Sequence, residues 1–149
     1  MADDVVSTNR LINAQVGPVL LVGHSYGGAV ITEAGNNPKV PGMVYVAAFA
    51  SEEGETLGGM AAKYPTPPAY SEFRQVDDGY LVPTEKGVWE SFAQDLSPAE
   101  QSLVFAVQGA TQGTILGTPI KKAARHSKPS WFVIASNDRT IAAKRRVYA

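Results

Sequence analysis

Ser25 lies in the pentapeptide Gly23-His24-Ser25-Tyr26-Gly27, which fits the pattern G-x-S-x-G. The four apolar residues 19–22 precede it and are short enough to form a buried strand, and residues 26–34 predict a helix. In this strand–turn–helix context the serine occupies a sharp, strained turn that exposes its hydroxyl above a sheet. The pattern therefore predicts a nucleophile at Ser25, with the backbone N–H of Tyr26 as an oxyanion donor.

The glycines around Ser25 have a predicted steric role. A Cβ at Gly23 or Gly27 would clash with the neighbouring strand or helix, and Gly28 would let the helix pack closely. The alternative interpretation is a glycine-rich turn with an idle serine. The apolar strand before the motif and the helix after it favour the nucleophile.

Composition limits the kind of chemistry and the kind of partner. The 149 residues favour a single domain, and 44% apolar with 18% charged residues is ordinary for a globular chain. A net charge of −1 gives no sign of a nucleic acid or anionic membrane partner. The chain has no cysteine, and its two histidines are His24 and His126. We therefore expect no disulfide, no thiol catalysis, no metal and no cofactor.

No targeting or membrane-spanning segment is expected. The sequence has no apolar run that approaches the length of a transmembrane helix. Its first residues are acidic, where a signal peptide would be basic. By default we expect a cytoplasmic protein.

Apolar segments elsewhere predict a parallel sheet flanked by helices. A helix is expected from residue 3 to residue 15, and strands at residues 43–50 and 131–135. Their continuous rather than alternating hydrophobicity is typical of strands covered on both faces, as in a parallel sheet. A basic helix at 121–126 and a final helix ending at Tyr148 are also expected, with Lys144, Arg145 and Arg146 on a solvated face.

The segment from residue 51 to residue 118 has a different character and reads as an insertion. Residues 73–76 and 80–82 predict a hairpin around an Asp-Gly turn. Helices are expected at 84–94 and 98–107, the second with Ser97 as N-cap and Glu100 three residues later. Four large side chains are expected to form its inner surface, as packing rather than as substrate contacts: Trp89, Phe92, Leu103 and Phe105.

The order of these motifs resembles the α/β-hydrolase superfamily. The likeness rests on the elbow from Gly23 to Gly28, the strand at 44–50, the insertion and the run Lys128-Pro-Ser-Trp-Phe-Val-Ile-Ala-Ser-Asn-Asp138. It is closest to a small bacterial esterase-like branch related to plant methylesterases and hydroxynitrile lyases. It implies a partial α/β-hydrolase fold, truncated at both ends: a mostly parallel sheet flanked by helices with a helical cap insertion. Residues 1–50 and 119–149 would form the core, and 51–118 the cap of the same domain.

The resemblance also implies a set of site residues. Ser25 would be the nucleophile, and Asp138, just after the strand at 131–135, the acid of a Ser-His-Asp triad. The other interpretation of Asp138 is an N-cap for the final helix. Glu52 or Glu53 is the alternative acid, because some members place it there.

The catalytic histidine of the superfamily has no counterpart after Asp138. His24 precedes the serine on the strand, so its side chain is expected to point away from that of Ser25. His126 precedes the strand at 131–135 and is expected at the opposite edge of the sheet. A base would then come from a second copy, with His126 as the candidate, or from an unconventional position.

Two functions follow as expectations. The first is a carboxylesterase-like serine hydrolase that attacks small esters and forms an acyl-enzyme. The second is a weakly active or inactive hydrolase-fold protein that binds a small hydrophobic ligand. Open strand edges also predict a homo-oligomer, because unpaired edges recruit other strands.

Overall fold

A computed structural model describes residues 1–141. Two segments, one at each end of this range, together form an α/β core. The core contains α1 (Ala2–Ala14), β1 (Leu21–Ser25), α2 (Gly27–Ala34), β2 (Met43–Ala48), the 3-10 turn η5 (Ala124–His126) and β6 (Ser130–Val133). The strands form a parallel sheet in the order β1-β2-β6. The parallel sheet predicted from the apolar runs is therefore confirmed. The predicted final helix, with Lys144, Arg145 and Arg146, lies outside the described residues.

The strands of the core sheet are shifted from their predicted ranges. Instead of covering 19–22, β1 begins at Leu21 and continues to the serine. The N–H of Val19 bonds to the carbonyl oxygen of Lys39 at 2.8 Å, before pairing with β2 begins. In β2, Ala47 adopts a φ of 43°, which a β-strand does not maintain, and pairing ends at the next residue.

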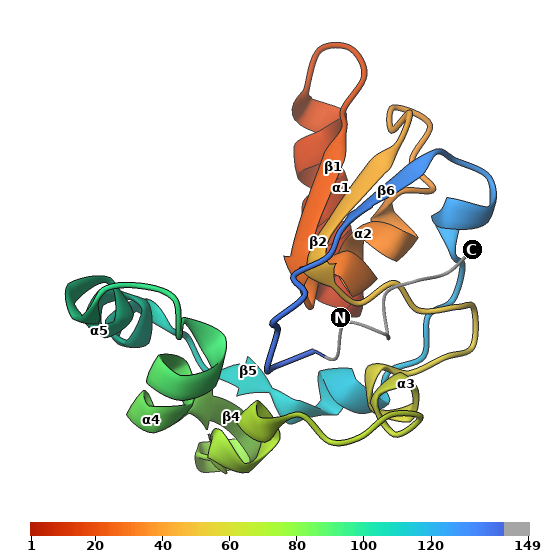
Figure 1. Ribbon diagram of the computed structural model, residues 1–149. Helices are drawn as coiled ribbons and strands as arrows, with labels where there is room; N and C mark the ends of the chain where they lie inside the picture. Colours follow the sequence, from red (N-terminus) through yellow and green to blue (C-terminus); the bar gives the residue numbers. More distant parts are fainter. Residues whose placement is uncertain (142–149) are drawn as a thin grey trace.

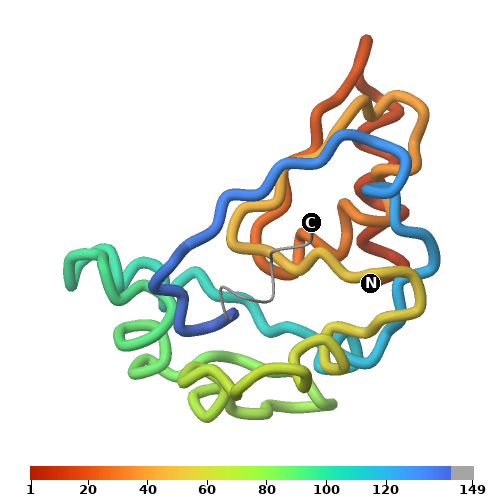
Figure 2. Tube along the Cα trace, turned by 45° about the vertical axis from the view of Figure 1, so that its right-hand side comes forward, coloured from red at the N-terminus to blue at the C-terminus, as the bar shows by residue number. Residues whose placement is uncertain are grey.

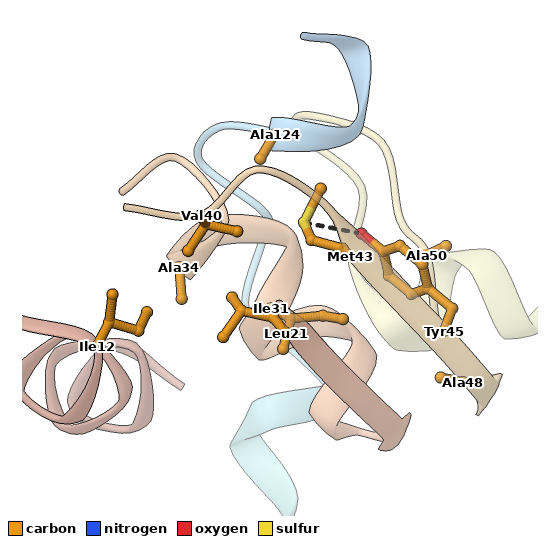
Figure 3. Packing of buried hydrophobic residues seen from close by; sticks show 10 residues of the cluster. All are labelled: Ile12, Leu21, Ile31, Ala34, Val40, Met43, Tyr45, Ala48, Ala50 and Ala124. Atoms are coloured by element: carbon orange, nitrogen blue, oxygen red, sulfur yellow. Dashed lines mark hydrogen bonds between the residues drawn. The ribbon is translucent and has the colours of Figure 1, made fainter. Parts of the chain in front are cut away.

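Helices α1 and α2 cover one face of the sheet and lie behind it in Figure 1. Figure 3 shows the apolar cluster between them: Ile12, Leu21, Ile31, Ala34, Val40, Met43, Tyr45, Ala48, Ala50 and Ala124. The buried hydroxyl of Tyr45 lies 2.9 Å from Thr32 Oγ1 and 3.8 Å from the sulfur of Met43. This cluster fixes β1 against α2, and therefore fixes the turn between them that carries Ser25.

The opposite face of the sheet is exposed, which contradicts the expectation of strands covered on both sides. The register places Val22, Val44 and Trp131 side by side across the three strands. Val22 is 63% exposed, and Trp131 and Val133 are each 55% exposed. In residues 1–141 both helices that pack on the sheet lie on its other face, so these apolar side chains meet solvent.

Residues 51–118, called the cap below, extend beyond the carboxyl ends of the strands (Figures 1 and 2). The cap contains α3 (Leu57–Ala61), η1 (Pro68–Glu72), β3 (Phe73–Gln75), η2 (Asp77–Gly79), β4 (Tyr80–Pro83), α4 (Glu85–Gly87), η3 (Val88–Phe92), α5 (Pro98–Val107), β5 (Thr111–Gln112) and η4 (Gly113–Gly117). The predicted hairpin is confirmed, since β3 and β4 pair antiparallel around Asp78 and Gly79, which have φ values of 50° and 79°. The pairing of β5 with β4 was not predicted.

The two predicted cap helices have different outcomes. Helix α5 has the predicted bounds, and its start is closed by Ser97 and Glu100, each bonding to the backbone of the other. The helix predicted at 84–94 is instead one α-helical turn followed by the π-helical turn η3. The hydrogen bond that defines the π-helical turn runs from the Ala93 N–H to the Val88 carbonyl oxygen, five residues back, at 2.8 Å.

Other expectations for the chain are wrong. Of the residues expected at the inner surface of the cap, Trp89, Leu103 and Phe105 are between 38% and 63% exposed, and only Phe92 lines the cavity described below. The basic segment 121–126 is not helical before Ala124 and forms only the short turn η5. Within residues 1–141, no helix combines the length and apolar content needed to cross a bilayer.

Candidate active site

The turn from β1 to α2 has the geometry that a nucleophilic serine requires. Ser25 ends the strand with a φ of 50°, in the left-handed region that residues with a Cβ rarely occupy. Tyr26 then adopts helical dihedrals as the N-cap of α2, and its carbonyl accepts from the N–H of Ala29 at 2.9 Å. The strained turn predicted at Ser25 is therefore present.

Two glycines of the turn are required by close packing, and one is not. A Cβ at Gly23 would lie 2.7 Å from the carbonyl oxygen of Gly27. A Cβ at Gly28 would lie 2.7 Å from the Cβ of Ala48 and would also overlap the carbonyl of Phe49. Gly27 has open space at its Cβ position, so the predicted clash there is wrong.

A cavity of about 230 Å³ is lined by residues at the carboxyl ends of β1 and β2, in the cap and in the loop after β6. Its lining includes Ser25 and Asp138, with other residues from β1, β2, η3 and the loops after η3 and β6. The residues are His24, Ser25, Ala47, Ser91, Phe92, Gln94, Asp95, Ala135, Asn137, Asp138, Thr140 and Ile141. The predicted nucleophile and the predicted acid thus face one small space beneath the cap.

Asp138 also has the structural role that the sequence left open. Its Oδ1 accepts hydrogen bonds from the N–H groups of Thr140, at 2.7 Å, and Ile141, at 2.9 Å. This arrangement is that of an aspartate closing the turn that follows it. Because both bonds go to one oxygen of the carboxylate, Asp138 can close this turn and line the cavity at the same time.

His24 is exposed, like Val22 two residues before it on β1. It is among the residues that line the Ser25 cavity, and its ring lies edge-on to that of Phe92 with centroids 6.4 Å apart. The register of β1 with β2 shifts between His24 and Ser25. That the side chain of His24 points away from that of Ser25 stays a prediction.

His126 and the alternative acid Glu52 form a separate cluster. His126 Nε2 lies 2.6 Å from Glu52 Oε2, and Arg125 pairs with the other oxygen of this carboxylate. Burial by itself would raise the pKa of Glu52, but the hydrogen bonds from His126 and Arg125 bring it below its ordinary value. Among the described residues that line the Ser25 cavity there is neither Glu52 nor the exposed Glu53.

Several cavity residues come from the cap, and of these only Phe92 was expected from the sequence. Ser91, Phe92, Gln94 and Asp95 reach the cavity from the end of η3 and the loop that follows it. Two side chains of the loop after β6 donate hydrogen bonds to the backbone of η3. Arg139 Nη1 donates to the Glu90 carbonyl at 2.7 Å, and Thr140 Oγ1 donates to that of Ser91 at 3.2 Å.

Comparison with known proteins identifies relatives that are longer than this chain. The carbendazim hydrolyzing esterase of Nocardioides is 42% identical over 57 residues, covering 37% of this chain and 24% of the relative. Alpha/beta hydrolase nvfD of Aspergillus novofumigatus is 29% identical over 133 residues, or 83% of this chain and 52% of the relative. The chain therefore spans about half of the length of these relatives or less.

A solved structure and a family model agree with the fold. The pyrethroid hydrolase PytH superimposes with a TM-score of 0.73 at 25% identity, over 93% of this chain and 59% of that protein. The model of the alpha/beta hydrolase family matches residues 2–149. From its sequence and from its parallel sheet with flanking helices, the chain belongs to the alpha/beta hydrolase family.

Proposed function

We propose that this chain carries the nucleophilic centre of a serine hydrolase that acts on small carboxylic esters. The observation that carries the proposal is the strained φ of Ser25 at the mouth of a cavity that Asp138 also lines. A strained serine between a strand and a helix is the geometry by which hydrolases expose a nucleophilic hydroxyl. The cavity volume of about 230 Å³ suits a small acyl group.

The proposed reaction passes through an acyl-enzyme. Ser25 Oγ attacks the ester carbonyl and transfers its proton to a base, while the carbonyl oxygen becomes an oxyanion that accepts from the N–H of Tyr26. The tetrahedral intermediate expels the alcohol, which takes the proton from the base. Water then attacks the acyl group, and the carboxylic acid leaves with regeneration of Ser25.

Within this chain, we propose His24 as the base. It is the histidine that lines the cavity of Ser25, whereas His126 is held by Glu52. The side chain of Asp138 lines the same cavity and would stabilise an imidazolium there. A base supplied by His126 of a second copy would first have to break the contact with Glu52, which makes it the weaker proposal.

The names of the relatives support hydrolysis in general. The esterase of Nocardioides is named for carbendazim, and PytH is named a pyrethroid hydrolase. Because this chain spans only part of each, their substrates do not transfer to it. The proposal is therefore limited to small esters, without a named compound.

The second candidate function is binding of a small ligand without turnover. It is favoured by one observation: Asp138 Oδ1 already accepts two backbone hydrogen bonds, so only part of the carboxylate serves the cavity. A base that is poorly oriented leaves a serine hydroxyl weakly nucleophilic. The cavity would then hold a small ester or a similar molecule without cleaving it.

Turnover of p-nitrophenyl acetate and butyrate distinguishes the two functions. The hydrolase is expected to release p-nitrophenol, and mass spectrometry of a quenched reaction is expected to find the acyl group on the peptide that contains Ser25. Ser25→Ala should reduce the rate to background, whereas Ser102→Ala, a change of an exposed serine on α5, should not change it. Equal rates for the wild type and Ser25→Ala would refute the proposal.

A further inference from the structure

The peptide that joins Ser25 to Tyr26 is held at its carbonyl end. The carbonyl oxygen of Ser25 accepts a hydrogen bond from the N–H of Phe49, just after β2, at 3.1 Å. The peptide is trans, so its N–H, which belongs to Tyr26, points away from Phe49. Because Tyr26 is the N-cap of α2, this N–H has no acceptor within the helix. The bond from Phe49 therefore restrains the plane of the peptide without using the N–H.

A second restraint acts on the side chain of Tyr26. Its hydroxyl donates to Asp4 Oδ2 on α1 at 2.6 Å, the short distance typical of a bond to an ionised acceptor. The ring is half-buried and packs against the apolar cluster that contains Phe49. Tyr26 is thus held from the end of β2 and from the first turn of α1.

The turn needs restraints from outside because its conformation is strained. Ser25 has a φ of 50°, and such dihedrals persist only where the surroundings hold them. A rotation of the Ser25–Tyr26 peptide that relaxes Ser25 also turns the N–H of Tyr26. Oxyanion donors are effective because they are oriented before the reaction begins. Loss of a restraint should therefore affect the transition state more than the binding of the ester.

We propose that Asp4 is a positioning residue for the oxyanion donor: it holds Tyr26 so that its N–H is already oriented when the ester is attacked. The inference rests on the proposed function, because it takes the N–H of Tyr26 as the donor. Asp4 does not occur among the described residues that line the Ser25 cavity. It acts through Tyr26, not on the substrate.

The kinetic test compares two substitutions of Asp4 with p-nitrophenyl butyrate as substrate. Asp4→Ala removes the acceptor, and we expect kcat to fall about tenfold with little change in KM, less than for complete loss of an oxyanion donor because the N–H remains. Asp4→Asn keeps an oxygen that can accept from the hydroxyl and should restore most of kcat. Asp3→Ala removes an exposed acid from the same turn of α1 and should change neither constant. An unchanged kcat in Asp4→Ala, or a loss that Asp4→Asn does not restore, would overturn the inference.

Tyr26→Phe separates this role from the ion pair of Asp4 with the amino terminus, 3.2 Å away. It removes the bond to Asp4 and keeps the ion pair, so we expect the same loss of kcat as in Asp4→Ala. The double variant should show no further loss, because both substitutions remove one bond. Losses that add in the double variant would assign the effect of Asp4 to another contact and refute the inference.

Relaxation of the ¹⁵N nucleus of the Tyr26 amide measures the restraint without turnover. We expect an order parameter of about 0.85 in the wild type and in Asp3→Ala, and a lower value, toward about 0.6, in folded Asp4→Ala. An unchanged order parameter in Asp4→Ala would also overturn the inference. If the order parameter falls but the wild type hydrolyses no ester, the restraint by Asp4 stands and the hydrolase proposal fails.

Discussion

The hydroxyl of Tyr26 donates a hydrogen bond to Asp4 Oδ2 at 2.6 Å, which ties the residue after Ser25 to the first turn of α1. The two residues are 22 positions apart in the sequence, so the bond joins separate elements. The bond from Tyr26 lowers the pKa of Asp4, and burial together with this bond raises the pKa of Tyr26 well above its ordinary value. The phenol therefore stays protonated and remains a donor over the neutral range.

Tyr26→Phe removes this donor and keeps the ring in place. Because the bond is exposed to solvent, we expect a loss of about 0.5–1 kcal/mol in the free energy of unfolding. Urea denaturation at pH 7 measures the loss. Tyr80→Phe on β4 is a comparable change at an exposed tyrosine outside the elbow, and an equal effect of the two substitutions would contradict the role of Asp4.

The stabilisation by Asp4 should depend on pH in the acid range. The pKa of Asp4 is lower in the folded protein than its ordinary value of 3.8, so its contribution is complete above about pH 4. It is lost as the pH falls through the lowered folded value. The stability difference between the wild type and Tyr26→Phe should therefore shrink below pH 4, as measured by thermal unfolding at a series of pH values.

Gly28 and Gly27 provide a matched pair for the packing of the elbow. Gly28→Ala places a Cβ against Ala48 and Phe49, which have little space to move, and we expect a loss of about 1–3 kcal/mol or more. Gly27→Ala meets nothing within 4 Å and should leave stability unchanged or slightly increased, because alanine favours a helix. Melting temperatures of the two variants test this, and a Gly27 variant as unstable as the Gly28 variant would refute it.

Substitution of His24 should reduce activity, whereas substitution of His126 should reduce stability. His24→Ala is expected to reduce turnover of p-nitrophenyl acetate at least about a hundredfold, as for loss of a general base. His126→Ala should keep most of the turnover and lower the melting temperature, because it removes a partner of Glu52. The opposite result in a variant with wild-type mass would favour a base supplied by a second copy.

Glu52 and Glu53 are adjacent and differ in their surroundings. The pKa of Glu52 lies below its ordinary value of 4.5, so its stabilisation is present above that pH and is lost as the pH falls through the lowered folded value. Glu52→Gln should therefore lower the melting temperature at pH 7 and have little effect near pH 3. Glu53→Gln is the control, and should have little effect at either pH.

Association through the sheet remains a proposal that a mass measurement can test. We expect a mass above 15.8 kDa by light scattering at micromolar concentration, because β1 and β6 each have one paired neighbour among the described strands. Val22→Lys and Trp131→Lys should each reduce the association. A monomeric mass for the wild type would refute the proposal.

Local patterns in the sequence predicted the parts of the fold that local interactions decide. The start of α5 follows from Ser97, Pro98 and Glu100, and the cap hairpin follows from its Asp-Gly turn. The elbow could be found because glycine spacing and the apolar run are both local. The register shift between His24 and Ser25 could not, because it depends on pairing with β2.

The residues that the cap adds to the cavity could not be predicted, because contacts between segments distant in the sequence bring them there. Gln94 follows a π-helical turn, which no residue pattern announces, and its partner Asn137 is 43 positions away. The pairing of His126 with Glu52 spans 74 positions. A prediction from neighbouring residues could place Ser25 and Asp138 at one edge of the sheet, but it could not identify what the cap adds.

The loop after β6 holds part of the cap and carries Asp138. Asn137, Arg139 and Thr140 each bond to a residue of the cap, and Asp138 lies between them. A displacement of the cap that keeps these bonds moves the loop with it, and one that leaves the loop in place must break them. The position of Asp138 and the position of the cap are therefore coupled.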